Sequence, residues 1–174
     1  MKALTSNIIF IGFMGAGKST LAKALAKELK SVCLDTDKII ENMEGKKIKK
    51  IFDERGEEYF RKLEKRVALW LEKSVQNTII STGGGFIHVE NLNKIGKVIY
   101  LKSSFEGIVK RLKTHPQAKK KIAKRPLLQD TKKAEELFKK RESLYERKAN
   151  FTIDVEKFKN EKEIAKELVK LILA

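Results

Sequence analysis

The sequence has little that would cross-link the chain, divide it or carry it into a membrane. Its 174 residues include one cysteine, Cys33, which excludes an internal disulfide and a thiolate zinc cluster and suits the reducing cytoplasm. There are two prolines and no Gly/Ser-rich linker, so we expect one domain over residues 1–174. No apolar run approaches the ~20 residues of a membrane helix, and the run at residues 8–11 breaks at Gly12. We therefore expect a cytoplasmic protein with no membrane span and no signal peptide.

Acidic residues are scarce relative to basic ones. The chain has 39 Lys and Arg against 23 Asp and Glu, a net charge of +16, which would attract polyanions such as nucleotides. Aromatic residues do not interleave with the basic ones and no nucleic-acid motif is present, so no nucleic-acid partner is predicted. Only seven of the basic residues are arginine. Because the planar arginine fork suits carboxylates and phosphates, these seven positions are candidates for anion binding.

Apolar segments of strand length alternate with longer segments of helical period. Strands are predicted at residues 7–11, 31–34, 78–80, 97–101 and 151–155. Helices are predicted at residues 18–30, 57–73, 105–113, 131–148 and 161–173. This alternation predicts an α/β fold, a three-layer α/β/α sandwich with a parallel sheet between helices.

A glycine-rich sequence follows the first predicted strand. Residues 12–19, GFMGAGKS, fit the phosphate-binding pattern G-x-x-x-x-G-K-[S/T] and precede a predicted helix. Backbone N–H groups there would bind phosphate oxygens, Lys18 would reach the β- and γ-phosphates, and the Ser19 hydroxyl would ligate Mg²⁺. The predicted nucleotide contacts in this loop are Gly15, Ala16, Gly17, Lys18, Ser19 and Thr20.

Two aspartates, Asp35 and Asp37, follow the second predicted strand. Alternate residues of an extended strand share a face, so both carboxylates could point into a cleft beside the phosphate-binding loop. One could bind Mg²⁺ while the other accepts a proton from a substrate hydroxyl. Asp37 could instead only cap the helix that follows.

Two further motifs are suited to a small anionic or hydroxylated ligand. Arg61 and Glu64 lie three residues apart on a predicted helix, where they can form an ion pair that orients the guanidinium. Residues 81–85, STGGG, end the third predicted strand, and their three glycines leave N–H groups open to an anion or a hydroxyl-rich ligand.

Taken in order, these motifs resemble those of the shikimate kinases, which transfer the γ-phosphoryl of ATP to the 3-hydroxyl of shikimate. The matching segments are GFMGAGKS at 12–19, LDTD at 34–37, IFDERGEEYFRKLE at 51–64, STGGG at 81–85, RPLL at 125–128 and RESLY at 141–145. The resemblance implies a P-loop kinase fold with a five-stranded sheet in the order 2-3-1-4-5. It also implies a mobile lid at about residues 112–128 and a substrate-binding helical segment at about residues 37–64.

On the nucleotide side, the resemblance implies that Lys18 holds the phosphates while Ser19 and Asp35 hold Mg²⁺, the cofactor that accompanies ATP. Arg125, in the lid, would move onto the transferring phosphoryl, and Arg111 would lie near the adenine. Lys18 and Arg125 are therefore counted with the catalytic residues.

On the substrate side, the resemblance implies that Asp37 binds the shikimate hydroxyls and acts as the base. Arg61 and Arg141 would bind the carboxylate of shikimate, with Glu64 steadying Arg61. The ring would be lined by Gly83, Gly84, Gly85, Phe52 and Phe60.

Two segments depart from the family's pattern. Residues 112–124 are longer and more basic than the lid of the family, and residues 156–160 lack the proline of its adenine-contacting loop. The alternative functions are another small-molecule P-loop kinase, such as a gluconate or nucleoside-monophosphate kinase, or a basic nucleotide-dependent binding module. A monomer is expected.

Four residues that often carry chemistry have plainer interpretations. Cys33 lies in a predicted strand and Trp70 on the apolar stripe of its helix, so both are expected to pack in the core. His88 and His115 stand alone, without the spacing of metal ligands.

Overall fold

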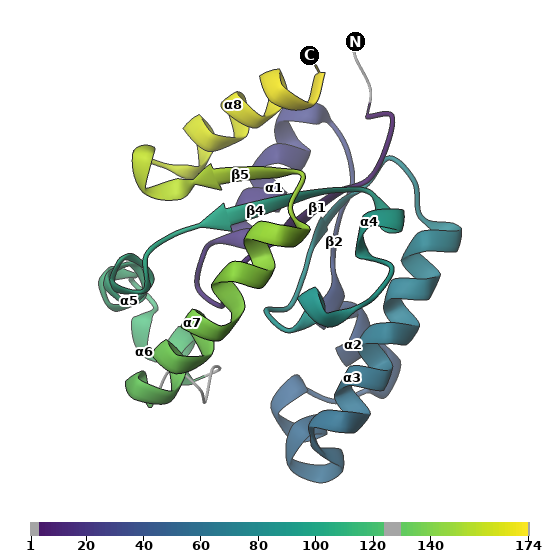
Figure 1. Ribbon diagram of the computed structural model, residues 1–174, viewed down its shortest axis with the longest axis vertical. Coiled ribbons are helices and arrows are strands. Elements are labelled where there is room, and N and C mark those ends of the chain that lie inside the picture. The colour runs from purple at the N-terminus through teal and green to yellow at the C-terminus, as the bar shows by residue number, and fades with distance from the viewer. Residues whose placement is uncertain (1–3, 124–129, 174) are drawn as a thin grey trace.

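The computed structural model describes residues 4–123 and 130–173, and its centre is a five-stranded parallel sheet (Figure 1). The strands are β1 (Ile8–Ile11), β2 (Cys33–Asp35), β3 (Ile79–Ser81), β4 (Lys97–Lys102) and β5 (Phe151–Asp154). Their order is β2-β3-β1-β4-β5, and every neighbouring pair is parallel. The sheet predicted from the sequence is confirmed.

Helices cover both faces of this sheet. They are α1 (Lys18–Leu29), α2 (Thr36–Glu44), α3 (Ile48–Ser74), α4 (Leu92–Ile95), α5 (Phe105–Thr114), α6 (Ala118–Ala123), α7 (Thr131–Lys148) and α8 (Glu161–Leu173). Two short 3₁₀ helices, η1 (Phe86–His88) and η3 (Val155–Lys157), join them. Helices α1 and α8 pack on one face, and α3 and α7 lie on the other (Figure 1). The three-layer arrangement is confirmed. In the part of the chain described, no helix is long and apolar enough to cross a bilayer.

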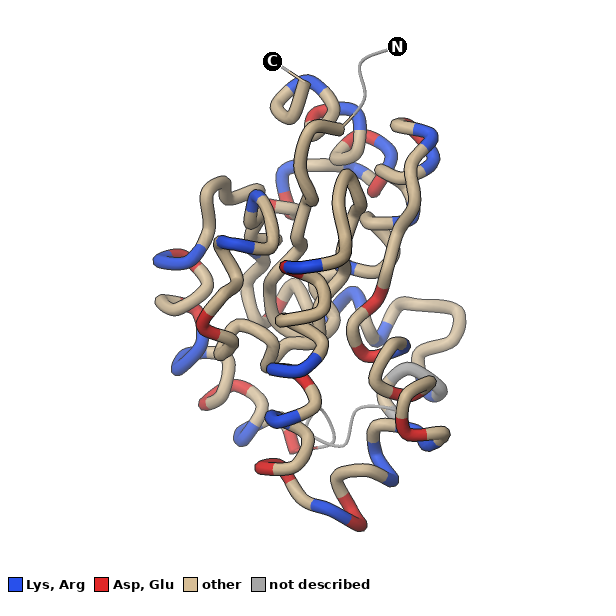
Figure 2. Tube along the Cα trace, turned by 90° about the vertical axis from the view of Figure 1, so that its right-hand side faces the viewer, with Lys and Arg blue, Asp and Glu red and all other residues tan. Residues whose placement is uncertain are grey.

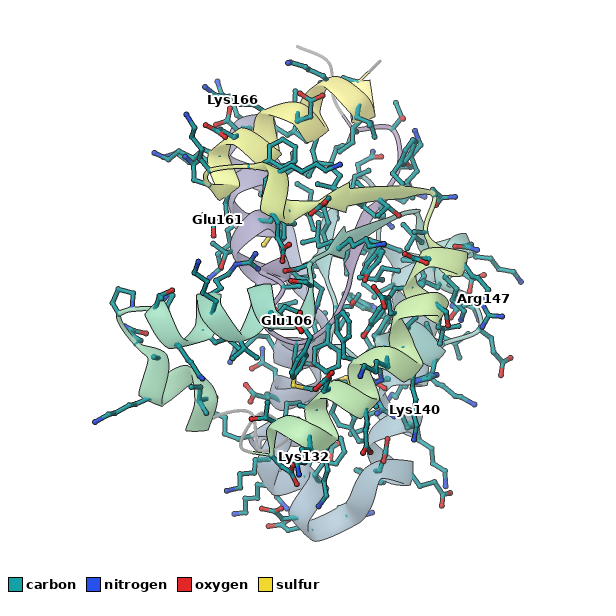
Figure 3. All side chains as sticks on the ribbon, turned by 60° about the vertical axis from the view of Figure 1, so that its left-hand side comes forward. Glu106, Lys132, Lys140, Arg147, Glu161 and Lys166 are labelled. Atoms are coloured by element: carbon teal, nitrogen blue, oxygen red, sulfur yellow. The ribbon has the colours of Figure 1, made fainter. Side chains whose placement is uncertain are left out.

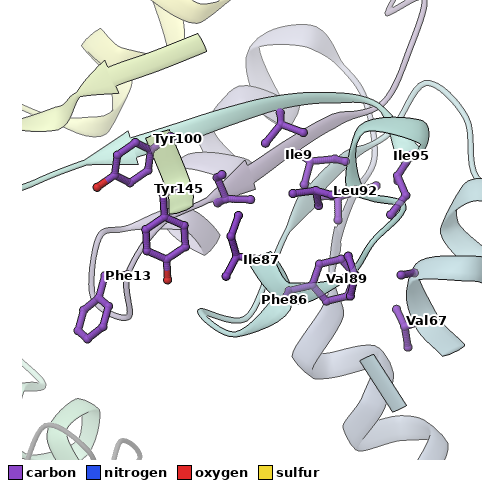
Figure 4. Close-up of a cluster of buried hydrophobic side chains, with 14 of the residues drawn as sticks. Ile9, Phe13, Val67, Phe86, Ile87, Val89, Leu92, Ile95, Tyr100 and Tyr145 are labelled. Atoms are coloured by element: carbon purple, nitrogen blue, oxygen red, sulfur yellow. The ribbon is translucent and has the colours of Figure 1, made fainter. Parts of the chain in front are cut away.

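The side chains of β1 point alternately to the two faces of the sheet, and the hydrophobic core is accordingly divided into two clusters. Ile8 and Phe10 pack with the apolar side chains of α1 and α8. Ile9 and Ile11 point the opposite way and pack with residues of α3, α7 and η1. Figure 4 shows part of this second cluster, in which the rings of Tyr100 and Tyr145 stack with centroids 5.3 Å apart. Since both faces of β1 are buried, the strand is apolar throughout rather than alternating with polar residues.

The long helix α3 consists of two helical stretches joined at a kink at Gly56, which has φ 77° and ψ 176°. The second stretch begins at Glu57, where the helix of residues 57–73 was predicted, and the first begins at Ile48. Trp70 is 45% exposed, so its predicted packing in the core was wrong. Leu71, one residue further and about 100° around the helix, is buried instead. Cys33 is half-buried at the edge of the cluster formed with α1 and α8.

Because all strands are parallel, their carboxyl ends meet at one edge of the sheet. β1 leads there into the loop before α1, β2 ends at Asp35, and β3 leads into the glycine loop of residues 83–85. Ligands of open α/β sheets bind at this edge, beside the strands whose connections diverge. The fold therefore brings together the motifs at residues 12–19, 34–37 and 81–85.

Candidate active site

The loop between β1 and α1 has the conformation needed to bind phosphate. Gly17 caps the N-terminus of α1 in the left-handed region, with φ 95°, a conformation that glycine adopts without strain. Lys18 is buried, and its Nζ donates hydrogen bonds to the carbonyls of Gly12 (2.7 Å) and Phe13 (3.0 Å). The ammonium is thus folded over the loop at the N-terminus of α1, where the helix dipole and open N–H groups favour an anion.

Ser19 and Asp35 form a pair of oxygen ligands next to this loop. The Ser19 hydroxyl donates to Asp35 Oδ2 at 2.8 Å and lies 3.0 Å from the Ser81 hydroxyl. The other carboxylate oxygen of Asp35 accepts the N–H groups of Asp37 and Lys38, so Asp35 caps α2. The alternative in which Asp37 serves only as that cap is wrong, because Asp35 fills the position.

These ligands have the chemistry of a magnesium site. Mg²⁺ prefers hard oxygen ligands and commonly uses one or two protein groups together with nucleotide phosphates. Within residues 4–123 and 130–173, no group of three or more His, Cys, Asp or Glu side chains could hold a metal by itself. A hydroxyl and a carboxylate beside a phosphate loop fit Mg²⁺ brought in by a nucleotide.

Asp37 is largely enclosed and faces the glycine loop. Its Oδ1 lies 2.5 Å from where a Cβ on Gly83 would stand, so no larger residue fits at Gly83 without displacing the carboxylate. Burial, together with the negative charges of Asp35 and Glu64, raises the pKa of Asp37 to about 6, while Lys18 acts in the opposite direction. A carboxylate with a pKa this close to neutrality is suited to accept a proton.

Arg61 is held between two carboxylates of its own helix. Its Nη1 donates to Glu64 Oε2 at 2.6 Å, and its Nη2 and Nε donate to Glu57 Oε1 at 2.7 and 3.2 Å. A Cβ on Gly85 would overlap the Arg61 guanidinium, which therefore lies directly against the glycine loop. Burial raises the pKa of Glu64, and Arg61 opposes the increase. The predicted pairing of Arg61 with Glu64 is present.

Arg141 approaches the same loop from α7. It is 8% exposed, whereas Lys140 and Arg147 lie on the outer side of this helix (Figure 3). Its Nη1 lies 3.5 Å from where a Cβ on Gly84 would stand. In the described residues, the buried side-chain atoms without a hydrogen-bond partner are Arg141 Nε and Glu64 Oε1. Because buried donors are nearly always paired, Arg141 Nε is a candidate hydrogen-bond donor to a bound ligand.

Sequence reasoning missed two residues that hold the glycine loop. The Tyr145 hydroxyl donates to the Gly84 carbonyl at 2.7 Å. Lys148 Nζ donates to the carbonyls of Ile87 and Val89, just after the loop, at 2.8 and 3.0 Å. The spacing of Tyr145, four residues after Arg141 on the same helix, was the available signal. Helix α7 thus both carries Arg141 and fixes the loop that Arg141 faces.

A cavity of about 230 Å³ joins the phosphate loop to the glycine loop. Its lining includes the predicted residues Gly15, Gly17, Lys18, Ser19, Thr20, Asp35, Asp37, Gly83, Gly84 and Arg111, and it also includes His115. Arg61, Arg141 and Gly85 are not among the lining residues, but they adjoin the cavity through the glycine loop. Phe52 and Phe60 are not lining residues either. Their rings are in contact, with centroids 4.6 Å apart, and Phe60 is buried in the core.

Arg111 stands between this cavity and a second one of about 220 Å³. It donates from Nη1 to the Gly15 carbonyl at 3.3 Å. The second cavity is lined by residues of α1 and α8 and by Ala16, Phe158, Lys159 and Asn160, and Glu161 lines both. Residues 158–160, where the expected proline is missing, therefore still form one wall of a cavity beside the phosphate loop. Arg125 lies outside the described residues, as do residues 124–129 of the predicted lid.

The fold and this site define a class of protein. A phosphate loop with its lysine, a serine–aspartate pair and an enclosed aspartate with a raised pKa surround one cavity at the carboxyl ends of the strands of a 2-3-1-4-5 sheet. These are the features of a P-loop kinase that acts on a small molecule.

Comparison with known proteins identifies the family. A family model described as shikimate kinase matches residues 14–173. A shikimate kinase of Helicobacter hepaticus is 41% identical over 148 residues, covering 85% of this chain and 86% of the relative. One from Clostridium botulinum is 46% identical over 147 residues, covering 81% and 83%. The structure of a shikimate kinase from Acinetobacter baumannii in complex with shikimate aligns with a TM-score of 0.84 at 34% identity, covering 97% of this chain and 93% of that one. The chain belongs to the shikimate kinase family, whose members are ATP-dependent kinases, and the resemblance inferred from the motifs is confirmed.

Proposed function

We propose that this enzyme transfers the γ-phosphoryl of ATP to the 3-hydroxyl of shikimate and releases shikimate 3-phosphate and ADP. One observation carries the proposal: a carboxylate with a raised pKa and two arginines face the same glycine loop. Asp37 lies against Gly83, while Arg141 and Arg61 lie against Gly84 and Gly85. A ligand lying along this loop would meet a carboxylate at one end and positive charge at the other, which suits a small molecule that carries a hydroxyl and a carboxylate.

In the proposed reaction, Asp37 accepts the proton of the 3-hydroxyl as its oxygen bonds to the γ-phosphorus. The bond between that phosphorus and the bridging oxygen of ADP breaks, and ADP leaves with the electron pair. Lys18 and the N–H groups of the loop hold the β- and γ-phosphates of ATP in line with this attack. Arg125 would come from the lid to the transferring phosphoryl, and closure of the lid would exclude water, which limits wasteful hydrolysis of ATP.

Ser19 and Asp35 are the residues that would hold Mg²⁺, the expected cofactor. When bound, the ion neutralises charge on the phosphates. We place the adenine of ATP in the second cavity, between Arg111 and residues 158–161, because this cavity adjoins the phosphate loop through Gly17.

Arg61 and Arg141 would bind the carboxylate of shikimate. Arg141 has an unpaired buried Nε with which to do so, and Glu64 holds Arg61 in place. Phe52 and Phe60 would provide an apolar wall within the substrate-binding segment of residues 37–64. We further propose a monomeric, cytoplasmic enzyme with one domain. The single five-stranded sheet, with one hydrophobic cluster on each face, supports the single domain.

The test is release of ADP by the purified protein with MgATP and one acceptor at a time. Shikimate, gluconate, a nucleoside monophosphate and a nucleic acid would be compared. We expect stimulation by shikimate alone. An equal response to all small acceptors, or a response only to nucleic acid, would contradict the proposal and favour one of the two alternatives.

A further inference from the structure

Glu57 is an acidic residue that neither the motifs nor the proposed mechanism uses, although it touches Arg61. It follows Gly56, the residue at which α3 is kinked, and so begins the second half of that helix. Its Oε1 accepts hydrogen bonds from both Nε and Nη2 of Arg61. The Glu57 side chain is 66% exposed, whereas that of Glu64, on the other side of Arg61, is only 2% exposed.

The two carboxylates are not equivalent partners of Arg61. Glu64 is buried and bonds Nη1, which is enough to fix the direction of the guanidinium. Glu57 accepts hydrogen bonds from Nε and Nη2 of Arg61. These two donors form one of the edges of the guanidinium with which arginine binds an external carboxylate. The hydrogen bonds from Arg61 and, more weakly, the charge of Arg141 lower the pKa of Glu57. Glu57 therefore occupies the edge of the Arg61 guanidinium that a carboxylate ligand would use.

We propose that the Glu57 carboxylate binds Arg61 in the enzyme without substrate and is displaced from it by the carboxylate of the substrate. This inference rests on the proposed function. On binding, the substrate replaces Glu57 at Nε and Nη2, and Glu57 turns outward into water, to which it is already largely exposed. Glu64 keeps Arg61 in position throughout the exchange.

The exchange gives Glu57 a role in specificity. A chain of net charge +16 attracts small anions, and an uncovered arginine pair would bind inorganic phosphate as well as the substrate. With Glu57 present, an anion reaches Arg61 only by displacing a carboxylate. Shikimate makes further contacts at Asp37 and the glycine loop that offset this displacement, and a free anion does not. Specificity then arises partly because Glu57 competes with every anion that could bind Arg61.

The test compares Glu57→Gln with a matched control, Glu58→Gln. Glu58 is the next residue on α3 and pairs with Lys62 at 2.9 Å, with both side chains exposed. Exposed ion pairs change an equilibrium by about two- to fivefold. We expect Glu57→Gln to lower the KM and the Kd for shikimate by about that factor, with a smaller change in kcat, and to strengthen competitive inhibition by inorganic phosphate. Glu58→Gln should change none of these values.

A neutral ligand distinguishes competition between Glu57 and the substrate carboxylate from a general change in the shape of the cleft. The carboxamide analogue of shikimate lacks the charge that displaces Glu57, so Glu57→Gln should leave its Kd unchanged. A higher KM for shikimate in Glu57→Gln would show that Glu57 positions Arg61, and an unchanged KM would show no competition. Either result, or an equal gain for the carboxamide, overturns the inference while turnover of shikimate by the unaltered protein still supports the proposed function. Absence of that turnover would instead refute the proposed function.

Discussion

At the scale of single residues, the environment of Asp37 predicts how activity depends on pH. Burial and the neighbouring carboxylates raise its pKa to about 6, well above the 3.8 of an exposed aspartate. A base must be unprotonated, so activity should be lost as the pH falls through this value. We expect kcat/KM for shikimate to show an acidic limb with an apparent pKa near 6, measured by release of ADP between pH 4.5 and 8 at saturating MgATP. A limb near pH 4 would remove Asp37 from the role of base.

The same burial predicts the effect of Asp37→Asn on stability. A carboxyl whose pKa is raised in the folded state stabilises the protein fully below pH 3.8, and the contribution is lost as the pH rises through about 6. At pH 7.5 the enclosed charge therefore destabilises the fold, and asparagine removes it. We expect Asp37→Asn to abolish phosphoryl transfer and to increase the free energy of unfolding by about 1–3 kcal/mol. Thermal unfolding followed by circular dichroism measures the second effect, and a lower Tm would contradict it.

The sequence predicted most of the site at this scale because the residues follow short motifs. Lys18, Ser19 and Thr20 come directly after glycines, and Asp37 lies two residues beyond Asp35, so their placement depends on local geometry. Glu57 also carried a signal, because it lies four residues before Arg61 on the predicted helix, the spacing of a helical ion pair. Which edge of the guanidinium Glu57 and Glu64 each take depends on side-chain packing that the sequence does not show.

At the scale of elements, α7 acts as a support for the glycine loop. Tyr145 bonds the Gly84 carbonyl, and its ring stacks on Tyr100 of β4. Removing the hydroxyl leaves that packing intact while releasing a partly buried carbonyl from its hydrogen bond, which costs about 1 kcal/mol. We expect Tyr145→Phe to raise the KM for shikimate several-fold, with little change in the KM for ATP, in steady-state assays.

Residue Tyr59 offers a control for this substitution. Its hydroxyl donates to Glu44 at 3.0 Å, on the α2–α3 side and apart from the glycine loop. Tyr59→Phe should leave both KM values unchanged. Equal effects of the two substitutions on the KM for shikimate would contradict a specific role for Tyr145.

The boundaries of the elements show what periodicity can and cannot decide. Each strand was predicted within two residues, because runs such as Ile8–Ile11 are bounded by polar or glycine residues. The helix predicted at residues 57–73 matches the part of α3 that follows Gly56, but the exposure of Trp70 was not predicted. Which side of a helix faces the core depends on how the helix packs against its neighbours, and a hydrophobic period read from one segment cannot fix that tertiary contact.

At the scale of the whole molecule, the positive charge is dispersed. Figure 2 shows acidic residues interspersed among the basic ones along the chain. Many of the described lysines also form exposed ion pairs with nearby acidic residues, such as Lys62 with Glu58 and Lys139 with Glu135. Among the arginines that the structure describes, Arg141 is buried and Arg61 and Arg111 are partly buried, whereas Arg55, Arg66 and Arg147 are exposed. This arrangement favours a small anionic ligand in a cleft over a polyanion on the surface.

At the amino ends of the strands, the buried side-chain amide of Asn7 joins neighbouring segments of the chain. Asn7 Nδ2 donates to the carbonyls of Val75 (2.7 Å) and Ile95 (2.9 Å), and its Oδ1 accepts the N–H of Thr78 (3.0 Å). Asn7→Ala leaves these buried groups unpaired, so we expect a loss of about 2–4 kcal/mol in the free energy of unfolding, measured by urea denaturation. Activity at 25 °C should not change, because Asn7 precedes β1 and the site lies beyond its carboxyl end.

Asn93→Ala, at an exposed position of α4, is the matched control and should leave stability unchanged. A loss of activity in folded Asn7→Ala would show that the two edges of the sheet are coupled.

The exposure of Trp70 has a practical consequence for spectroscopy. It is the only tryptophan in the chain, and its indole is already 45% exposed in the folded protein. Its emission should shift little when the chain unfolds, which makes intrinsic fluorescence a poor monitor of denaturation. An exposed tryptophan also tolerates replacement. With Trp70 changed to Phe, an indole introduced at Phe52 would be the sole tryptophan, beside the proposed acceptor pocket, and its emission could report occupancy directly.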